Sequence, residues 1–210
     1  MNTDDLIATL ALRPAPPPLR AGWLGLELLA AIAGSAALFL AVAGSRAGLP
    51  GLWENPLIAA KTLWPAISCL VALPMLLALL RPEGRIAHPA RLGLLPALAV
   101  ALWIAGFAGR APAARFAEFA ALPIVECVGL ILVIATVPLW LALRLAARGA
   151  PTRPALTGAM AGLVAGTGAA AGYSFFCLQD NPLFYVTWYG TATLLSMAAG
   201  AWAGARRLRW

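Results

Sequence analysis

Two cysteines, Cys127 and Cys177, are the residues of this chain best suited by type and placement to do chemistry. Each has a carboxylate nearby in sequence, because Glu126 directly precedes Cys127 and Asp180 lies three residues beyond Cys177. Two thiols can form a disulfide when their Cα atoms approach to roughly 4.4–6.8 Å. Two thiolates with one or two carboxylates also suit a soft metal ion. The same pattern is equally compatible with two small buried side chains that only pack.

Motifs of catalysis are otherwise missing from the sequence. It contains no phosphate-binding glycine loop, no HExxH, no nucleophile elbow and no CxxC. The lack of a close cysteine pair weakens a thiol-oxidoreductase interpretation, and the third cysteine, Cys69, is interpreted as packing. We therefore expect no enzyme activity and no cofactor beyond a transiently bound heavy-metal ion. Two alternative functions stay open at this point, namely a membrane thiol-redox enzyme and a small-molecule permease.

The composition indicates the environment in which the two thiols lie. The chain has 210 residues, of which 62% are apolar and only 11% are charged. Soluble globular domains carry about 25% charged residues, because they must present a polar surface to water. The sequence therefore predicts an integral membrane protein solvated mostly by the lipid bilayer. Its net charge of +7 is carried mainly by arginines in short loops, so it does not indicate direct binding of nucleic acid.

Six apolar runs have about the length of roughly 20 residues that a helix needs to cross a bilayer. They lie at about 21–43, 59–80, 92–109, 121–143, 155–177 and 183–205. Short loops join them, so we expect an all-α fold: a polytopic bundle of six transmembrane helices over residues 21–205. A tail over residues 1–20 precedes the bundle, and a short basic end over residues 206–210 follows it. The oligomeric state is not predicted.

The distribution of cations predicts how the bundle is oriented. An even number of spans puts both termini on one side, and that side carries Arg13, Arg20, Arg81, Arg85, Arg91, Arg144, Arg148, Arg153, Arg206, Arg207 and Arg209. The other side carries only Arg46, Lys61, Arg110 and Arg115. Basic loops stay in the cytoplasm, so both termini are expected there. Cys127 and Cys177 then lie near the opposite surface, which is oxidising in a bacterium. We expect Lys61, in the first turns of its span, to reach the interface with its long side chain.

The tail is predicted to be disordered or a short helix, followed by a stiff proline-rich spacer. Asp4 and Asp5 suit the first turn of a helix, where the helix dipole favours anions. Leu6, Ile7 and Leu10 then fall on one side of that helix. So few apolar residues do not stabilise an isolated helix, which leaves two interpretations: a helix that forms in the groove of a partner protein, and a frayed tail without a role.

A stripe of small residues marks the fifth apolar run. Gly158, Gly162 and Gly166 recur at intervals of four and give two overlapping GxxxG patterns. Such stripes allow two helix backbones to approach closely in a membrane. We interpret the stripe as a packing surface rather than a path for a substrate.

Several segments resemble the NrsF-type membrane anti-sigma factors, which are negative regulators of extracytoplasmic-function sigma factors in bacteria. The matching segments are Thr3-Asp4-Asp5-Leu6-Ile7, Arg148-Gly149-Ala150-Pro151-Thr152-Arg153-Pro154, Cys177-Leu178-Gln179-Asp180-Asn181-Pro182-Leu183-Phe184, Thr187-Trp188-Tyr189-Gly190 and Arg206-Arg207-Leu208-Arg209-Trp210. The likeness extends over essentially the full length, and its C-terminal half is the specific part.

This resemblance implies a protein of the bacterial inner membrane that sequesters an extracytoplasmic-function sigma factor and releases it under heavy-metal or oxidative stress. It places Cys127 and Cys177 at the sensing pair, as a disulfide or a metal site, with Glu126 and Asp180 as helpers. Capture of the sigma factor is expected at the cytoplasmic tail, through Asp4, Asp5, Leu6, Ile7 and Leu10.

Overall fold

The computed structural model describes residues 2–12, 20–84 and 90–208, apart from the side chains of Leu10, Pro50 and Leu52. Every regular element in this part of the chain is helical, which confirms the predicted all-α class. The prolines of the predicted spacer lie outside the described residues.

Six long helices occupy the six predicted apolar runs, and each begins and ends within four residues of its predicted limits. They are α2 (Ala21–Ala43), α4 (Pro56–Leu79), α5 (Ala90–Ala108), α6 (Ala121–Ala146), α7 (Pro154–Tyr173) and α8 (Pro182–Arg207). Three short elements accompany them: α1 (Thr3–Ala11), α3 (Leu49–Leu52) and the 3₁₀ turn η1 (Pro112–Ala114). Within the described residues, five helices are long and apolar enough to cross a membrane, namely α2, α4, α5, α6 and α7. The chain is thus a membrane protein, and a sixth span at α8 stays a prediction.

The starts of α4 and α8 follow the same local rule. In each, an asparagine at the N-cap is followed by a proline in the first turn, at Asn55-Pro56 and Asn181-Pro182. The asparagine oxygen accepts a hydrogen bond from the backbone N–H two residues on, and proline lacks an N–H that would need a partner. These pairs fix the point at which each helix begins.

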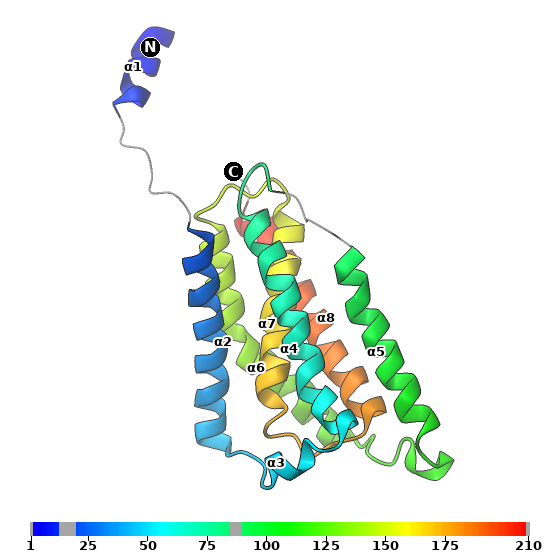
Figure 1. Cartoon of the computed structure of the whole chain (residues 1–210). Helices are drawn as coiled ribbons and strands as arrows, with labels where there is room; N and C mark the ends of the chain where they lie inside the picture. Colours follow the sequence, from blue (N-terminus) through cyan, green and yellow to red (C-terminus); the bar gives the residue numbers. More distant parts are fainter. Residues whose placement is uncertain (1, 13–19, 85–89, 209–210) are drawn as a thin grey trace.

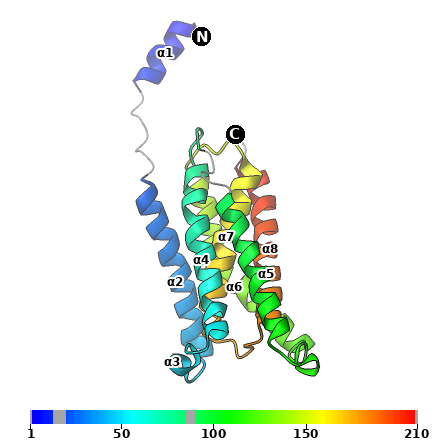
Figure 2. The same cartoon turned by 45° about the vertical axis from the view of Figure 1, so that its right-hand side comes forward.

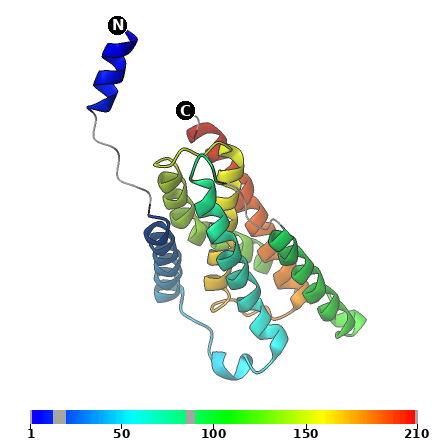
Figure 3. The same cartoon turned by 45° about the horizontal axis from the view of Figure 1, so that its top comes forward.

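The long helices run alternately up and down in one bundle (Figures 1 and 2). We call the end at which α2 begins and α8 finishes the terminal end, and the opposite end the distal end. Helix α7 lies among α2, α4, α6 and α8, and it packs most extensively against α8. Helix α5 stands at the edge, where it contacts α4 and α8 (Figure 3). Its Gly106 is its one buried residue, and any side chain there would meet Pro182 at the start of α8.

The glycine stripe of α7 is a packing surface, as predicted. A Cβ atom on Gly162 would lie 2.1 Å from the backbone oxygen of Ser196, and one on Gly158 would lie 2.0 Å from that of Gly200. Conversely, a Cβ atom on Gly204 of α8 would lie 2.9 Å from the Cα atom of Gly158. Glycine on both helices therefore brings the backbones of α7 and α8 into direct contact, which is the usual means of close helix association in a membrane.

Buried side chains divide into two clusters along the bundle. One lies toward the terminal end and includes Cys69, Leu76 and Ala146, together with Leu208 after the end of α8. The other lies toward the distal end and includes Cys127, Cys177 and several aromatic residues of α7 and α8. The two thiols of interest therefore belong to the distal half of the molecule.

Candidate functional site

The connection between α7 and α8, residues 174–181, is the place where the distal loops meet. At its centre the two Asp180 carboxylate oxygens accept hydrogen bonds from Arg46 Nη1 and Nη2 at 2.6 and 2.9 Å. Lys61 Nζ lies 3.2 Å from Asp180 Oδ1. Lys61 Nζ and Arg46 Nη1 also donate to the backbone oxygen of Cys177, at 2.6 and 3.0 Å. We call Asp180, Arg46, Lys61 and the Cys177 carbonyl the Asp180 cluster.

Lys61 corrects one expectation from the sequence. Its side chain does not extend to the interface but is 1% exposed, with its ammonium group turned inward to Asp180 and Cys177. A buried ammonium is costly without a counter-charge and hydrogen-bond acceptors. Asp180 and the Cys177 carbonyl supply both, and this explains why the lysine lies inside the bundle.

The cluster holds Asp180 in its charged form. Burial of the carboxyl group alone would raise its pKa, but the hydrogen bonds from Arg46 and the charge and hydrogen bond of Lys61 outweigh that effect. The pKa of Asp180 is therefore lowered from its usual value. The hydrogen bond to Asp180 likewise raises the pKa of Arg46. The groups are thus fixed as one anion between two cations.

The connection between α5 and α6 reaches the same segment from the other side. Asn181 Nδ2 donates to the backbone oxygen of Arg115 at 2.8 Å, and the Asn181 N–H points to Glu118 Oε2 at 3.4 Å. Arg110 lies 3.8 Å from Glu118 and 3.5 Å from the backbone oxygen of Asp180. All four distal cations are therefore engaged by protein groups, since Arg115 donates to two backbone oxygens and stacks on Phe107.

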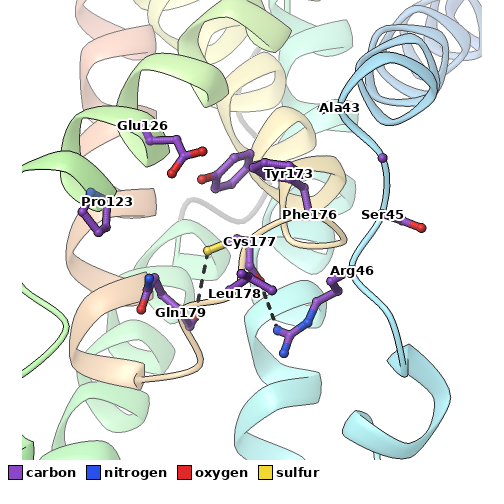
Figure 4. A pocket seen from close by; sticks show the side chains of 11 residues that line it. Ala43, Ser45, Arg46, Pro123, Glu126, Tyr173, Phe176, Cys177, Leu178 and Gln179 are labelled. Atoms are coloured by element: carbon purple, nitrogen blue, oxygen red, sulfur yellow. Dashed lines mark hydrogen bonds between the residues drawn. The ribbon is translucent and has the colours of Figure 1, made fainter.

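Cys177 faces a cavity of about 210 Å³ at the distal end (Figure 4). Its Sγ atom points into the space between Glu126 and Gln179, with the Gln179 backbone oxygen at 4.0 Å. Tyr173 and Arg46 form other parts of the wall. One water needs about 10–15 Å³ of such volume, so the cavity has room for a small ion or reagent beside the thiol.

Cys127 lies deeper than Cys177. Both thiols are free and buried, and they share the distal cluster of buried side chains. Only Cys177 lines the cavity, and α6 turns the preceding residue, Glu126, toward that space. Among the described residues, no group of three or more His, Cys, Asp or Glu side chains is placed to hold a metal ion. A metal at this site would thus depend on the two sulfur atoms.

The two predicted helper carboxylates have different surroundings. Glu126 lines the cavity beside the Cys177 thiol, whereas Asp180 is occupied by Arg46 and Lys61. Sequence reasoning did not assign Arg46 or Lys61 to the site. Their positions 131 and 116 residues before Cys177 give no local signal, although a single lysine inside an apolar run is itself unusual.

Helix α1 carries the predicted partner-binding residues on an exposed surface. Leu6 and Ile7 are 41% and 58% exposed, and Asp4 and Asp5 are exposed in the first turn. The Leu10 side chain lies outside the described residues. Helix α1 is absent from the extensive helix contacts of the bundle and lies beyond its terminal end in Figure 1. Its apolar side chains are therefore available to another protein.

Comparison with known proteins identifies a family whose model matches this chain. A family model described as "NrsF: Negative regulator of sigma F" matches residues 9–210, so the match begins after Asp4, Asp5, Leu6 and Ile7. A curated relative, the probable anti-sigma-F factor NrsF of Azospira oryzae, is 43% identical over 61 residues. That alignment covers 29% of this chain and 29% of the relative, which is less than a third of either. No solved structure matches the chain.

Proposed function

Since this chain belongs to the NrsF family of negative regulators of sigma F, we propose that it is a membrane-bound anti-sigma factor that releases its partner under heavy-metal or oxidative stress. The partner is an extracytoplasmic-function sigma factor, and the protein itself is neither an enzyme nor a direct ligand of nucleic acid. The family match over most of the chain is the observation that carries this proposal.

The proposed location is the bacterial inner membrane, with both termini in the cytoplasm. Every described arginine of the terminal end is exposed: Arg20, Arg81, Arg91, Arg144, Arg148, Arg153, Arg206 and Arg207. The cations of the distal end are bound by protein groups. The free positive charge is thus concentrated at one end of the bundle, which favours a cytoplasmic position for that end.

Capture of the sigma factor is assigned to α1. Its exposed Leu6 and Ile7 fit a helix-in-groove interaction, in which an amphipathic helix places its apolar side in a hydrophobic groove. A nine-residue helix offers less than the roughly 800 Å² per partner that is usual for stable complexes. We therefore propose that the exposed arginine loops of the terminal end add to the contact.

The stress signal is proposed to act at Cys127 and Cys177. An oxidant would take two electrons and two protons from the thiols as the S–S bond forms, and a soft metal would displace the protons and bridge the two sulfurs. Reversing a 1:99 population of two states needs about 5.5 kcal/mol. A disulfide contributes about 2–4 kcal/mol, which is a large part of this free energy, and a bridging metal adds its binding free energy to the state in which both sulfurs are ligands.

Co-purification with the sigma factor tests the capture step. We expect the full chain in mild detergent to retain the sigma factor, and deletion of residues 2–12 to abolish this. Ile7→Asp should weaken capture strongly, because it adds a charge to the apolar side of α1. Ala8→Asp is the matched control, since it adds the same charge to the opposite side. Equal retention by the deletion variant would refute a role for α1.

Reporter transcription tests the sensing step. Cys127→Ser and Cys177→Ser, singly and together, should keep the sigma-dependent promoter silent when cadmium or diamide is added. Cys69→Ser is the control, because Cys69 lies in the other buried cluster, and it should respond as the unmodified protein does. A full response in the double variant would remove these thiols from the mechanism.

A further inference from the structure

We infer that the Asp180 cluster is the joint through which a reaction at Cys177 is transmitted to the rest of the bundle. The inference rests on the proposed thiol sensing and names the residues that convert it into a movement of helices. Arg46 and Lys61 are positioning residues in this scheme, because they act on the backbone that carries the thiol.

The first argument is that the residue carrying the thiol binds the two cations of the cluster through its backbone. The carbonyl oxygen of Cys177 accepts hydrogen bonds from both Lys61 Nζ and Arg46 Nη1. The same two cations hold the Asp180 carboxylate three residues later. A displacement of the Cys177 backbone therefore disturbs both cations at once.

The second argument is the number of elements that end at the cluster. Arg46 lies in the connection after α2, and its backbone N–H donates to the Phe175 carbonyl at 2.9 Å. Lys61 lies in the first turns of α4, where Thr62 also pairs with Ser174 at 2.7 Å. The cluster thus ties the segment from Phe175 to Asp180 to two helices that are distant in sequence.

The third argument concerns what a reaction at the thiol requires. Cys177 lies in the connection after α7 and Cys127 lies on α6, and a disulfide or a bridging metal would draw Sγ of Cys177 toward α6. Any part of that displacement that rotation about the Cα–Cβ bond does not absorb moves the Cys177 backbone and its carbonyl, which weakens the hydrogen bond from a lysine that is 1% exposed. A buried ammonium that loses an acceptor is destabilised. The reacted state is therefore one in which the cluster opens and α4 shifts to restore the solvation of Lys61.

A dose–response experiment on the full chain in cells tests this inference. Sigma-dependent transcription is measured against the concentration of diamide, the oxidant that accepts the two electrons and two protons of the thiols. Arg46→Lys keeps the charge but loses the bidentate hydrogen bonding to Asp180. The cluster should then open more readily, so several-fold less diamide should give the half-maximal response. Asp180→Asn should raise transcription without diamide toward the fully induced level. Glu54→Gln, which neutralises an exposed carboxylate at the same end, should leave the curve unchanged.

The second measurement combines two substitutions to test whether the Asp180 cluster acts after the Cys177 thiol. If the cluster acts after the thiol, Asp180→Asn should keep transcription high when Cys177→Ser is added, although Cys177→Ser alone abolishes the response. Immunoblotting of membranes shows that each variant is present, and Arg46→Lys alone decides the matter if Asp180→Asn does not accumulate.

Two results would overturn the inference. One is an Arg46→Lys variant with the diamide curve of the unmodified protein, and the other is an Asp180→Asn effect that disappears with Cys177→Ser. Either result leaves the proposed function intact when the unmodified protein retains the sigma factor in the pull-down. Failure of that pull-down would refute the proposed function itself, so the two failures are distinguished.

Discussion

Asp180 binds two cations with one carboxylate, and those cations also donate to a backbone oxygen. Replacing a buried ionic group is costly mainly because its partners are left without compensation, by about 3–5 kcal/mol for a fully buried pair. Asp180 is partly open to solvent at 21% side-chain exposure, so the loss for Asp180→Asn should fall toward the lower part of that range. Lys61 is 1% exposed and has Asp180 as its carboxylate partner. The position of Lys61 therefore depends on Asp180.

The lowered pKa of Asp180 gives a stability that depends on pH. A carboxyl group whose pKa is lower in the folded state stabilises the fold at pH values above its unfolded pKa, near 3.8. That contribution is lost as the pH falls from about 3.8 through the folded-state pKa. We expect the melting temperature of the purified protein to drop over this acidic range. Asp180→Asn should melt at lower temperature at pH 7 and show a smaller drop, and parallel curves for the two proteins would contradict this.

The chemistry at residue scale was partly predictable. Cys177 and Asp180 stand out because a thiol and an acid next to an Asn-Pro pair mark a turn between two apolar runs. Their partners Arg46 and Lys61 were not identified, because a contact across more than a hundred residues has no periodicity that a single sequence reveals. For the same reason Lys61 was wrongly expected at the interface.

At the scale of elements, the contact between α7 and α8 depends on glycines at four-residue intervals. The limits of the long helices were predictable, because apolar runs and proline-led starts are local signals. The stripe also indicated that α7 packs closely, but not that α8 would meet it with Gly200 and Gly204. The sequence of α8 mixes polar residues with its apolar ones, and α8 is not among the five helices that are apolar enough to span a membrane.

Gly162→Ala tests this contact. The new methyl group would lie about 2 Å from backbone atoms of α8, so the two helices must separate. Overpacking of this kind typically costs about 1–3 kcal/mol, and backbone atoms cannot rotate away, so we expect the upper part of that range in thermal or detergent-denaturation measurements.

Gly190→Ala is the matched control for that variant. It lies on α8 with nothing within 4 Å of its added Cβ. The exchange should be neutral or stabilising by up to about 1 kcal/mol, because alanine is the better helix former. Equal stability of the two variants would contradict the packing described for α7 and α8.

At the scale of the whole molecule, charge distinguishes the two ends. Counting basic residues along the chain predicted the asymmetry. The folded structure adds that the few distal cations have partners, whereas the described terminal arginines are exposed. Two of the segments that resemble the NrsF family also lie at the two ends of the bundle. Asp180 organises the distal loops, and Gly149 sits so close to the carbonyl of Leu80 that no side chain would fit there.

Cysteine accessibility tests the orientation of the bundle. In a variant without the native cysteines, Ala113→Cys introduces a thiol at the exposed distal turn and Thr152→Cys introduces one in the exposed terminal loop. We expect a membrane-impermeant maleimide to label Ala113→Cys on intact spheroplasts. Thr152→Cys should react only after the membrane is permeabilised. The reverse pattern would place α1 and its proposed partner on opposite sides of the membrane.

Direct backbone contact between α7 and α8 has a mechanical consequence. Where glycines of α7 and α8 meet backbone to backbone, the two helices cannot slide past each other by small rotamer changes, so they move as one unit at that contact. A displacement at the distal end of α7 would therefore carry α8 with it toward the terminal end, about 30 Å away, where Leu208 belongs to the other buried cluster. The helices at the edge of the bundle are then the easier ones to displace, and α5, which contacts α4 and α8 but buries only Gly106, is expected to move first.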